Sequence, residues 1–111
     1  MKSTKSTREE RIARALLLNG SFSEREGVTQ LNITSGRNEI SDIERKLNIK
    51  VNRVWEKTAD GLGQYYRYSI ANKRQAYKVM KHANRLALAR DGEPFNATET
   101  RAILARFKGE I

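Results

Sequence analysis

A change in hydrophobic periodicity after Asn48 constrains this fold more than any other feature of the sequence. Up to Leu47, the apolar residues recur at helical spacing. Residues 49–57 and 64–70 are instead rich in Val, Ile, Trp and Tyr, and a short loop containing Asp60-Gly61 separates the two runs. Two β-prone runs joined by such a loop predict a β-hairpin. The chain is therefore expected to place helices before and after a hairpin.

Capping signals predict where the first helix begins and ends. Thr7 and Glu10 have the spacing of a capping box, in which Thr7 accepts a bond from an early backbone N–H and Glu10 reaches back. Gly20 suits the C-terminal end of a helix. These signals predict a helix over about 8–18. A second capping box, Ser23 with Glu26, follows Phe22 at the position that often staples to a helix, and predicts a short second helix.

The third predicted helix spans residues 34–47, with Thr34 or Ser35 as its N-cap. When each residue is rotated by about 100° around the helix axis, the residues of the inner side fall within an arc of about 60°. That inner side comprises Gly36, Ile40, Ile43 and Leu47, and Gly36 is expected to permit close approach of the second helix. The opposite side carries Asn38, Ser41, Asp42 and Arg45, flanked by Arg37. This helix is amphipathic.

The hairpin strands differ in how clearly they show an inner face. In the second run Tyr66, Tyr68 and Ile70 alternate with Tyr65, Arg67 and Ser69 and share one side. In the first run Val51 and Trp55 share parity with Arg53 and Lys57, so alternation does not assign an inner face.

Two further helices are predicted at residues 73–90 and 97–108, capped by Asn72 and Asn96. The first has an inner stripe of mostly small residues, Ala76, Val79, Met80, Ala83, Leu86 and Ala87. With Ile103, Leu104 and Phe107, this stripe either packs on the first helix or forms a dimer seam, and the interpretation favoured here is a homodimer. Its opposite side carries a basic stripe, Arg74, Lys78, Lys81 and Arg85.

The charge distribution indicates a polyanionic partner. Lys and Arg number 22 against 13 Asp and Glu, a formal net charge of +9. No acidic residue separates Asn72 from Arg90, although like charges at i,i+4 destabilise a helix slightly. We therefore expect the basic stripe to contact phosphate, the alternative being a merely solvated face. No secretory signal, cysteine or apolar run of about 18 residues is present, so a cytoplasmic protein without a membrane span is expected.

The order helix, short helix, tight turn, helix and hairpin resembles a winged helix-turn-helix domain, particularly small phage and prophage proteins. The matching stretch is 31–47, followed by Ile49 and 66–70. The resemblance covers residues 8–70 and implies a winged helix-turn-helix domain of three helices plus a hairpin wing. Outside it, the polar residues 1–7 are expected to form a flexible basic tail, and 71–111 a helical C-terminal extension of two helices. The expected fold class is α+β, mostly α. The resemblance also implies a phage or prophage transcriptional regulator that binds double-stranded DNA sequence-specifically, with helix 34–47 in the major groove and hairpin 51–70 on the backbone.

Groove chemistry selects the candidate contact residues. Arginine suits guanine and asparagine suits adenine, so the candidate base contacts are Ser35, Arg37, Asn38, Ser41 and Arg45. The carboxylate of Asp42 is repelled by phosphate, so Asp42 is expected either to accept a hydrogen bond from cytosine or to neutralise Lys46. Trp55, Tyr65 and Tyr66 are expected to pack within the sheet rather than stack on unpaired bases. The candidate backbone contacts are Lys2, Lys5, Arg53, Lys57, Arg67, Arg74, Lys78, Lys81 and Arg85.

Nothing in the sequence predicts an enzyme. His82 is expected at the surface, the acidic residues are expected in caps or exposed helical positions, and no catalytic residue, metal ligand or cofactor is predicted. Two alternatives to DNA binding stay open. One is a protein-interaction or inhibitor module that docks on a host or phage protein, and the other is a structured-RNA binder.

Overall fold

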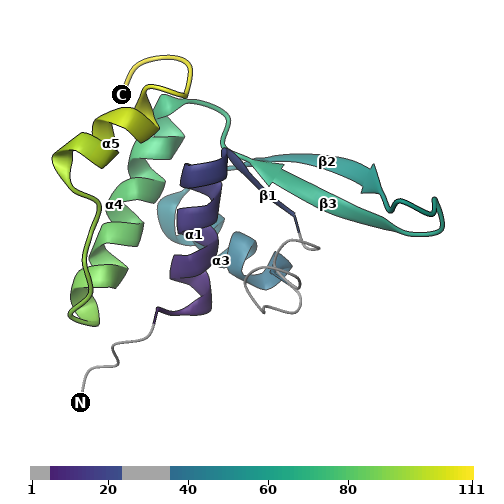
Figure 1. The fold of residues 1–111 in the computed structure, drawn as a ribbon, viewed down its shortest axis with the longest axis horizontal. Coiled ribbons are helices and arrows are strands. Elements are labelled where there is room, and N and C mark those ends of the chain that lie inside the picture. Colours follow the sequence, from purple (N-terminus) through teal and green to yellow (C-terminus); the bar gives the residue numbers. More distant parts are fainter. Residues whose placement is uncertain (1–5, 24–35) are drawn as a thin grey trace.

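The computed structural model describes residues 6–23 and 36–111, where four helices and three strands follow one another along the chain (Figure 1). The α+β class is confirmed, and helices contribute more of these residues than strands do. The elements are α1 (Arg8–Asn19), β1 (Ser21–Ser23), α3 (Arg37–Leu47), β2 (Asn52–Lys57), β3 (Gln64–Ser69), α4 (Lys73–Ala89) and α5 (Ala97–Leu104).

The predicted hairpin is confirmed, and it belongs to a three-stranded antiparallel sheet with strand order β1-β3-β2. Strands β2 and β3, called the wing below, extend away from the helices (Figure 1). Tyr68 of β3 pairs with Phe22 on one side and Arg53 on the other, and Tyr66 pairs with Trp55. Opposed residues share a face, so the ring of Trp55 lies on the same side of the sheet as Tyr66 and Tyr68.

Strand β1 was not predicted. Phe22, expected to staple onto a helix, lies instead in β1 and is completely buried. A three-residue strand shows too little alternation to be recognised before its partner strand is known. The second predicted helix lies outside the described residues. Helix α3 begins at Arg37 with Gly36 as its N-cap and without a side-chain capping bond, so the N-cap predicted at Thr34 or Ser35, themselves outside the described residues, is wrong.

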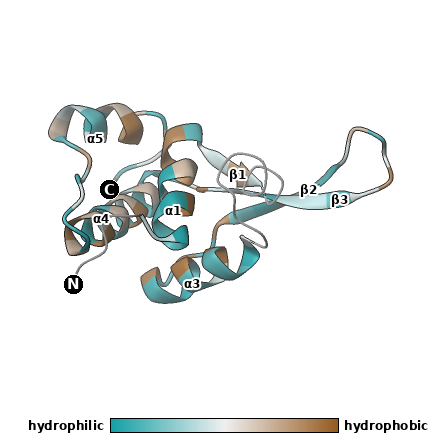
Figure 2. Ribbon diagram, turned by 60° about the horizontal axis from the view of Figure 1, so that its bottom comes forward, coloured by the Kyte–Doolittle hydropathy of each residue, from teal (hydrophilic) through white to brown (hydrophobic). Residues whose placement is uncertain are grey.

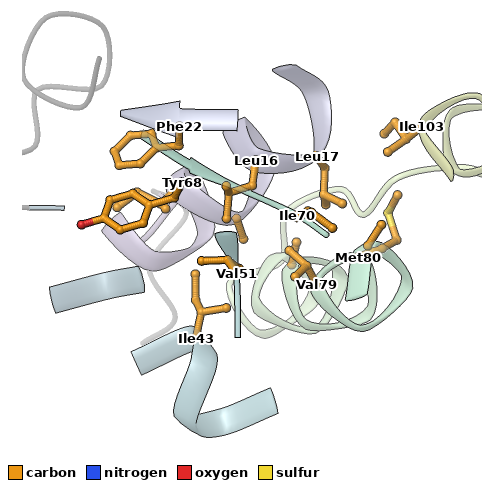
Figure 3. Close-up of a cluster of buried hydrophobic side chains, with 14 of the residues drawn as sticks. Leu16, Leu17, Phe22, Ile43, Val51, Tyr68, Ile70, Val79, Met80 and Ile103 are labelled. Carbon is orange, nitrogen blue, oxygen red and sulfur yellow. The ribbon is translucent and has the colours of Figure 1, made fainter. Parts of the chain in front are cut away.

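The core lies where α1, α3, α4 and the base of the sheet meet (Figure 3). Leu16 and Leu17 of α1, Ile43 of α3 and Val79 of α4 are almost completely buried there. Ile103 extends the cluster to α5. Every helix therefore contributes its predicted apolar side, as the 3.6-residue period requires.

The helix caps are largely those predicted. Thr7 Oγ1 accepts from the backbone N–H of Glu10 at 3.1 Å, and Gly20 ends α1 with a φ of 78°. Asn72 caps α4, and Asn96 forms a complete capping box with Glu99 on α5. Helix α5 ends at Leu104 rather than near residue 108. The expectation that Glu10 reaches back in a capping box is wrong, because its carboxylate is buried against Arg90.

The inner stripe of α4 packs against α1 of the same chain. Ala76, Val79, Ala83 and Ala87 are each at most 1% exposed, and their small size lets the two helices approach closely. Of the two arrangements predicted for this stripe, packing on the first helix is therefore the one present, and a homodimer through another surface stays a prediction. None of the helices in the described ranges is long and apolar enough to cross a bilayer.

The space around Gly36 shows how tightly the start of α3 is packed. A Cβ at this position would lie 2.8 Å from Cε1 and 2.9 Å from Cζ of Phe22, so the close described neighbour is β1. The φ of −59° suits any residue, which leaves crowding as the cost. We expect Gly36→Ala to lower the free energy of unfolding by about 1–3 kcal/mol, measured by urea denaturation.

The control for this substitution is Ser41→Ala, on the exposed side of the same helix. Its stability is expected within about 0.5 kcal/mol of the wild type. Equal stabilities of the two variants would contradict the tight packing.

Candidate nucleic-acid interface

The outward side of α3 is open to solvent. Arg37, Asn38, Ser41 and Arg45 are exposed, whereas Ile40 and Ile43 on the opposite side are 1% exposed. Ser35, the fifth predicted base contact, lies outside the described residues. The structure thus presents the other four together on one helix face, as the sequence predicted.

Asp42 neutralises a different partner from the one expected. Its Oδ1 accepts from Nη2 of Arg45 at 2.7 Å, an exposed i,i+3 ion pair. Lys46, the expected partner, instead donates to Glu9 of α1 at 2.9 Å. A base that binds Arg45 would therefore have to displace the carboxylate of Asp42. This exchange costs little free energy, because the ion pair is exposed to solvent.

Glu9 joins three helices. Its Oε2 lies 2.5 Å from Nε2 of His82 on α4, and its Oε1 accepts from Lys46 on α3. Burial opposes ionisation of Glu9, but the hydrogen bonds of His82 and Lys46 outweigh it and hold the pKa of Glu9 below its usual 4.5. His82 is only 6% exposed, so the expectation of a surface histidine is wrong. Its position at the edge of the apolar stripe was the available signal.

Glu44 fastens the wing to α3. Its two carboxylate oxygens accept from Nη2 and Nη1 of Arg53 at 2.6 and 2.9 Å, and Oε2 also accepts from the backbone N–H of Val51 at 2.9 Å. The hydrogen bond from Arg53, opposed by burial, lowers the pKa of Glu44. The same bond raises the pKa of Arg53. Together these bonds, called the Glu44 clamp below, hold β2 in position relative to α3.

The clamp also explains why alternation failed in the first β run. Val51, just before β2, is buried, and Arg53 and Trp55 of β2 oppose Tyr68 and Tyr66 on one face of the sheet. A cation is tolerated on that face because Glu44 binds it. Glu44 was predicted at an exposed helical position, but its side chain is 12% exposed, so this prediction is wrong. The one available signal was Arg53 itself, an unexplained charge between Val51 and Trp55.

Arg67 lies on the other face of the sheet and ties its three strands together. Its Nε donates to Glu56 of β2 at 2.6 Å, and its Nη1 donates to Ser21 of β1 at 2.9 Å. Arg53 and Arg67, both predicted to contact phosphate, are thus engaged within the protein. Lys57 at the end of β2 is exposed, and Lys2 and Lys5 lie outside the described residues.

Three aromatic rings, called the aromatic ladder below, run from the core onto the wing. Tyr68 is completely buried, Tyr66 lies tilted beside it at 5.9 Å between centroids, and Trp55 stacks on Tyr66 at 3.8 Å. Packing within the sheet was expected for Trp55, Tyr65 and Tyr66, and both of these tyrosines are half-buried. Trp55, however, is 54% exposed. The guanidinium of Arg37 on α3 lies 6.0 Å above the Tyr66 ring, so α3 and this side of the wing are neighbours.

The basic stripe of α4 reaches the C-terminal end of α3. Lys78 is half-buried and donates to the Leu47 carbonyl at 3.5 Å. Arg74, Lys81 and Arg85 are exposed along the same helix. The stripe therefore adds cationic surface next to α3.

The carboxylate of Glu10 also serves the fold. Glu10 is completely buried and accepts from Nε and Nη2 of Arg90 at 2.8 and 2.7 Å, which joins the start of α1 to the end of α4. Within residues 6–23 and 36–111, His, Asp and Glu side chains form no group of three that could hold a metal ion.

These features define an α+β domain with a polar helix face beside a basic, partly aromatic wing. The chain belongs to the family described as uncharacterised protein PM1773, whose model matches residues 3–111. No curated protein and no solved structure matches the chain.

The Glu44 clamp predicts acid sensitivity. A carboxyl whose pKa is lowered by folding stabilises the protein above its unfolded pKa near 4.5, and this contribution disappears as pH falls through the lower folded pKa. We expect Glu44→Gln to be less stable than the wild type at about pH 6 and to lose less stability between about pH 6 and pH 3, measured by urea denaturation. Arg53→Gln, which removes the partner, should behave similarly. An unchanged pH dependence in both variants would contradict this role of the clamp.

Proposed function

We propose that this protein binds double-stranded DNA in the manner of a winged helix-turn-helix protein, with α3 in the major groove and the wing along the backbone. The observation that carries the proposal is the division of α3 into a buried apolar side and an exposed side bearing Arg37, Asn38 and Ser41. The groove admits one such helix, and side chains of these types read base edges.

The surroundings of α3 supply charges of the required sign. Lys57 lies on the wing, and Arg74, Lys81 and Arg85 lie on α4, all exposed. Phosphate contacts of this kind provide most of the affinity for DNA, and the net charge of +9 attracts the polyanion over a longer range. Arg53 and Arg67 support the wing from within. The resemblance to phage and prophage regulators makes transcriptional regulation the proposed biological role.

Selection of bound sequences from random duplexes, at two salt concentrations, tests this function. We expect an enriched motif. Asn38→Ala should relax preference at one base position, at a cost of roughly 1–3 kcal/mol. Arg74→Ala should weaken binding to all sequences and reduce the salt slope by about one.

Arg101→Ala is the matched control for charge. Arg101 is exposed on α5, which lies on the opposite side of the molecule from α3 (Figure 2). Its loss should leave both the motif and the salt slope unchanged. If no motif is enriched and Asn38→Ala binds like the wild type, α3 does not read DNA. Tighter binding to structured RNA, or weak DNA binding together with one stoichiometric protein partner, would favour the alternative functions.

A further inference from the structure

We propose that the exposed ring of Trp55 is a stacking site for an unpaired nucleobase, so that the protein binds duplex DNA carrying an unpaired base more tightly than intact duplex. This inference rests on the proposed function and specifies the form of DNA that the wing recognises. The observation behind it is that Trp55, a large aromatic side chain, is 54% exposed to solvent.

The aromatic ladder covers the Trp55 ring from one side, and more than half of the residue is exposed. Tyr66 stacks on it at 3.8 Å with the ring planes inclined by 25°, yet Trp55 remains 54% exposed. Two stacked rings thus end in an indole face that nothing in the aromatic ladder covers. Nucleobases stack on such faces without regard to sequence, because every base has a π-face.

The ladder holds this face in a fixed orientation. Tyr68 is completely buried in the core and contacts Tyr66, and the neighbouring Arg53 is clamped by Glu44 of α3. A ring anchored in this way loses little conformational entropy when a base stacks on it. An ordinary exposed tryptophan on a mobile loop lacks this advantage.

The flanking charges favour a nucleic acid over an apolar protein partner. Lys57 follows Trp55 by two residues on the same strand face, and the Arg37 guanidinium lies 6.0 Å above Tyr66. A base stacked on Trp55 therefore has Lys57 of β2 nearby as a cation for its phosphates, and Arg37 adds positive charge beside the aromatic ladder. An unpaired base is required, because the bases of an intact duplex have both faces covered by their neighbours.

The test compares two DNA probes with the full-length chain: a duplex of the selected sequence, and the same duplex with one unpaired thymine. Fluorescence anisotropy of labelled DNA gives both affinities. We expect the wild type to prefer the probe with the unpaired base by at least about fivefold, and Trp55→Ala to lose about 5- to 100-fold in affinity for that probe alone. Trp55 is the sole tryptophan, so its own fluorescence should be quenched by the probe with the unpaired base and much less by intact duplex.

Val54→Ala is the matched control, since Val54 is 59% exposed on the opposite face of the same strand and should affect neither probe. Trp55→Phe keeps a stacking ring and should retain a preference for the unpaired base. Equal wild-type affinities for both probes, equal losses on both probes in Trp55→Ala, loss of preference in Trp55→Phe, or unquenched Trp55 each overturn the inference. Binding to neither probe would instead overturn the proposed function itself.

Discussion

The arrangement of the candidate DNA surface depends on the carboxylate of Glu44. It accepts bonds from both terminal nitrogens of Arg53 and from the Val51 N–H, so one side chain of α3 holds the first strand of the wing at three points. A bidentate guanidinium–carboxylate pair has a narrow geometry, which a single hydrogen bond lacks. Without this clamp, nothing comparable would fix the angle between the polar side of α3 and the aromatic side of the wing.

Two other carboxylates extend the same principle to the helices. Glu9 connects α1 to α3 and α4 through Lys46 and His82, and Glu10 connects the start of α1 to Arg90 at the end of α4. Partly buried ion pairs contribute little net stability, because desolvation offsets much of their attraction. Their value here is orientation: an apolar interface of small residues tolerates sliding, whereas a hydrogen-bonded pair does so only by leaving charges unpaired.

The aromatic ladder carries the order of the core outward. Tyr68 belongs to the core, Tyr66 is half-buried, and Trp55 is more exposed than buried. Arg37 of α3 lies 6.0 Å from the centre of the Tyr66 ring, so the candidate base-reading helix and the aromatic side of the wing are neighbours. The basic stripe of α4 meets the end of α3 through Lys78.

Local sequence patterns predict where α1, α4 and α5 begin, the presence of the hairpin, and which side of α3 faces water. Each of these depends on residues three or four apart or on simple alternation, so local spacing is sufficient. Four features depend on contacts between distant parts of the chain: the third strand, the burial of His82, the packing of the α4 stripe on α1, and the partners of the charged residues. The bonds of Glu9 to Lys46 and His82 span 37 and 73 residues, and that of Glu10 to Arg90 spans 80. Such pairs cannot be predicted from local spacing, because the packing of the apolar core determines which distant side chains lie next to each other.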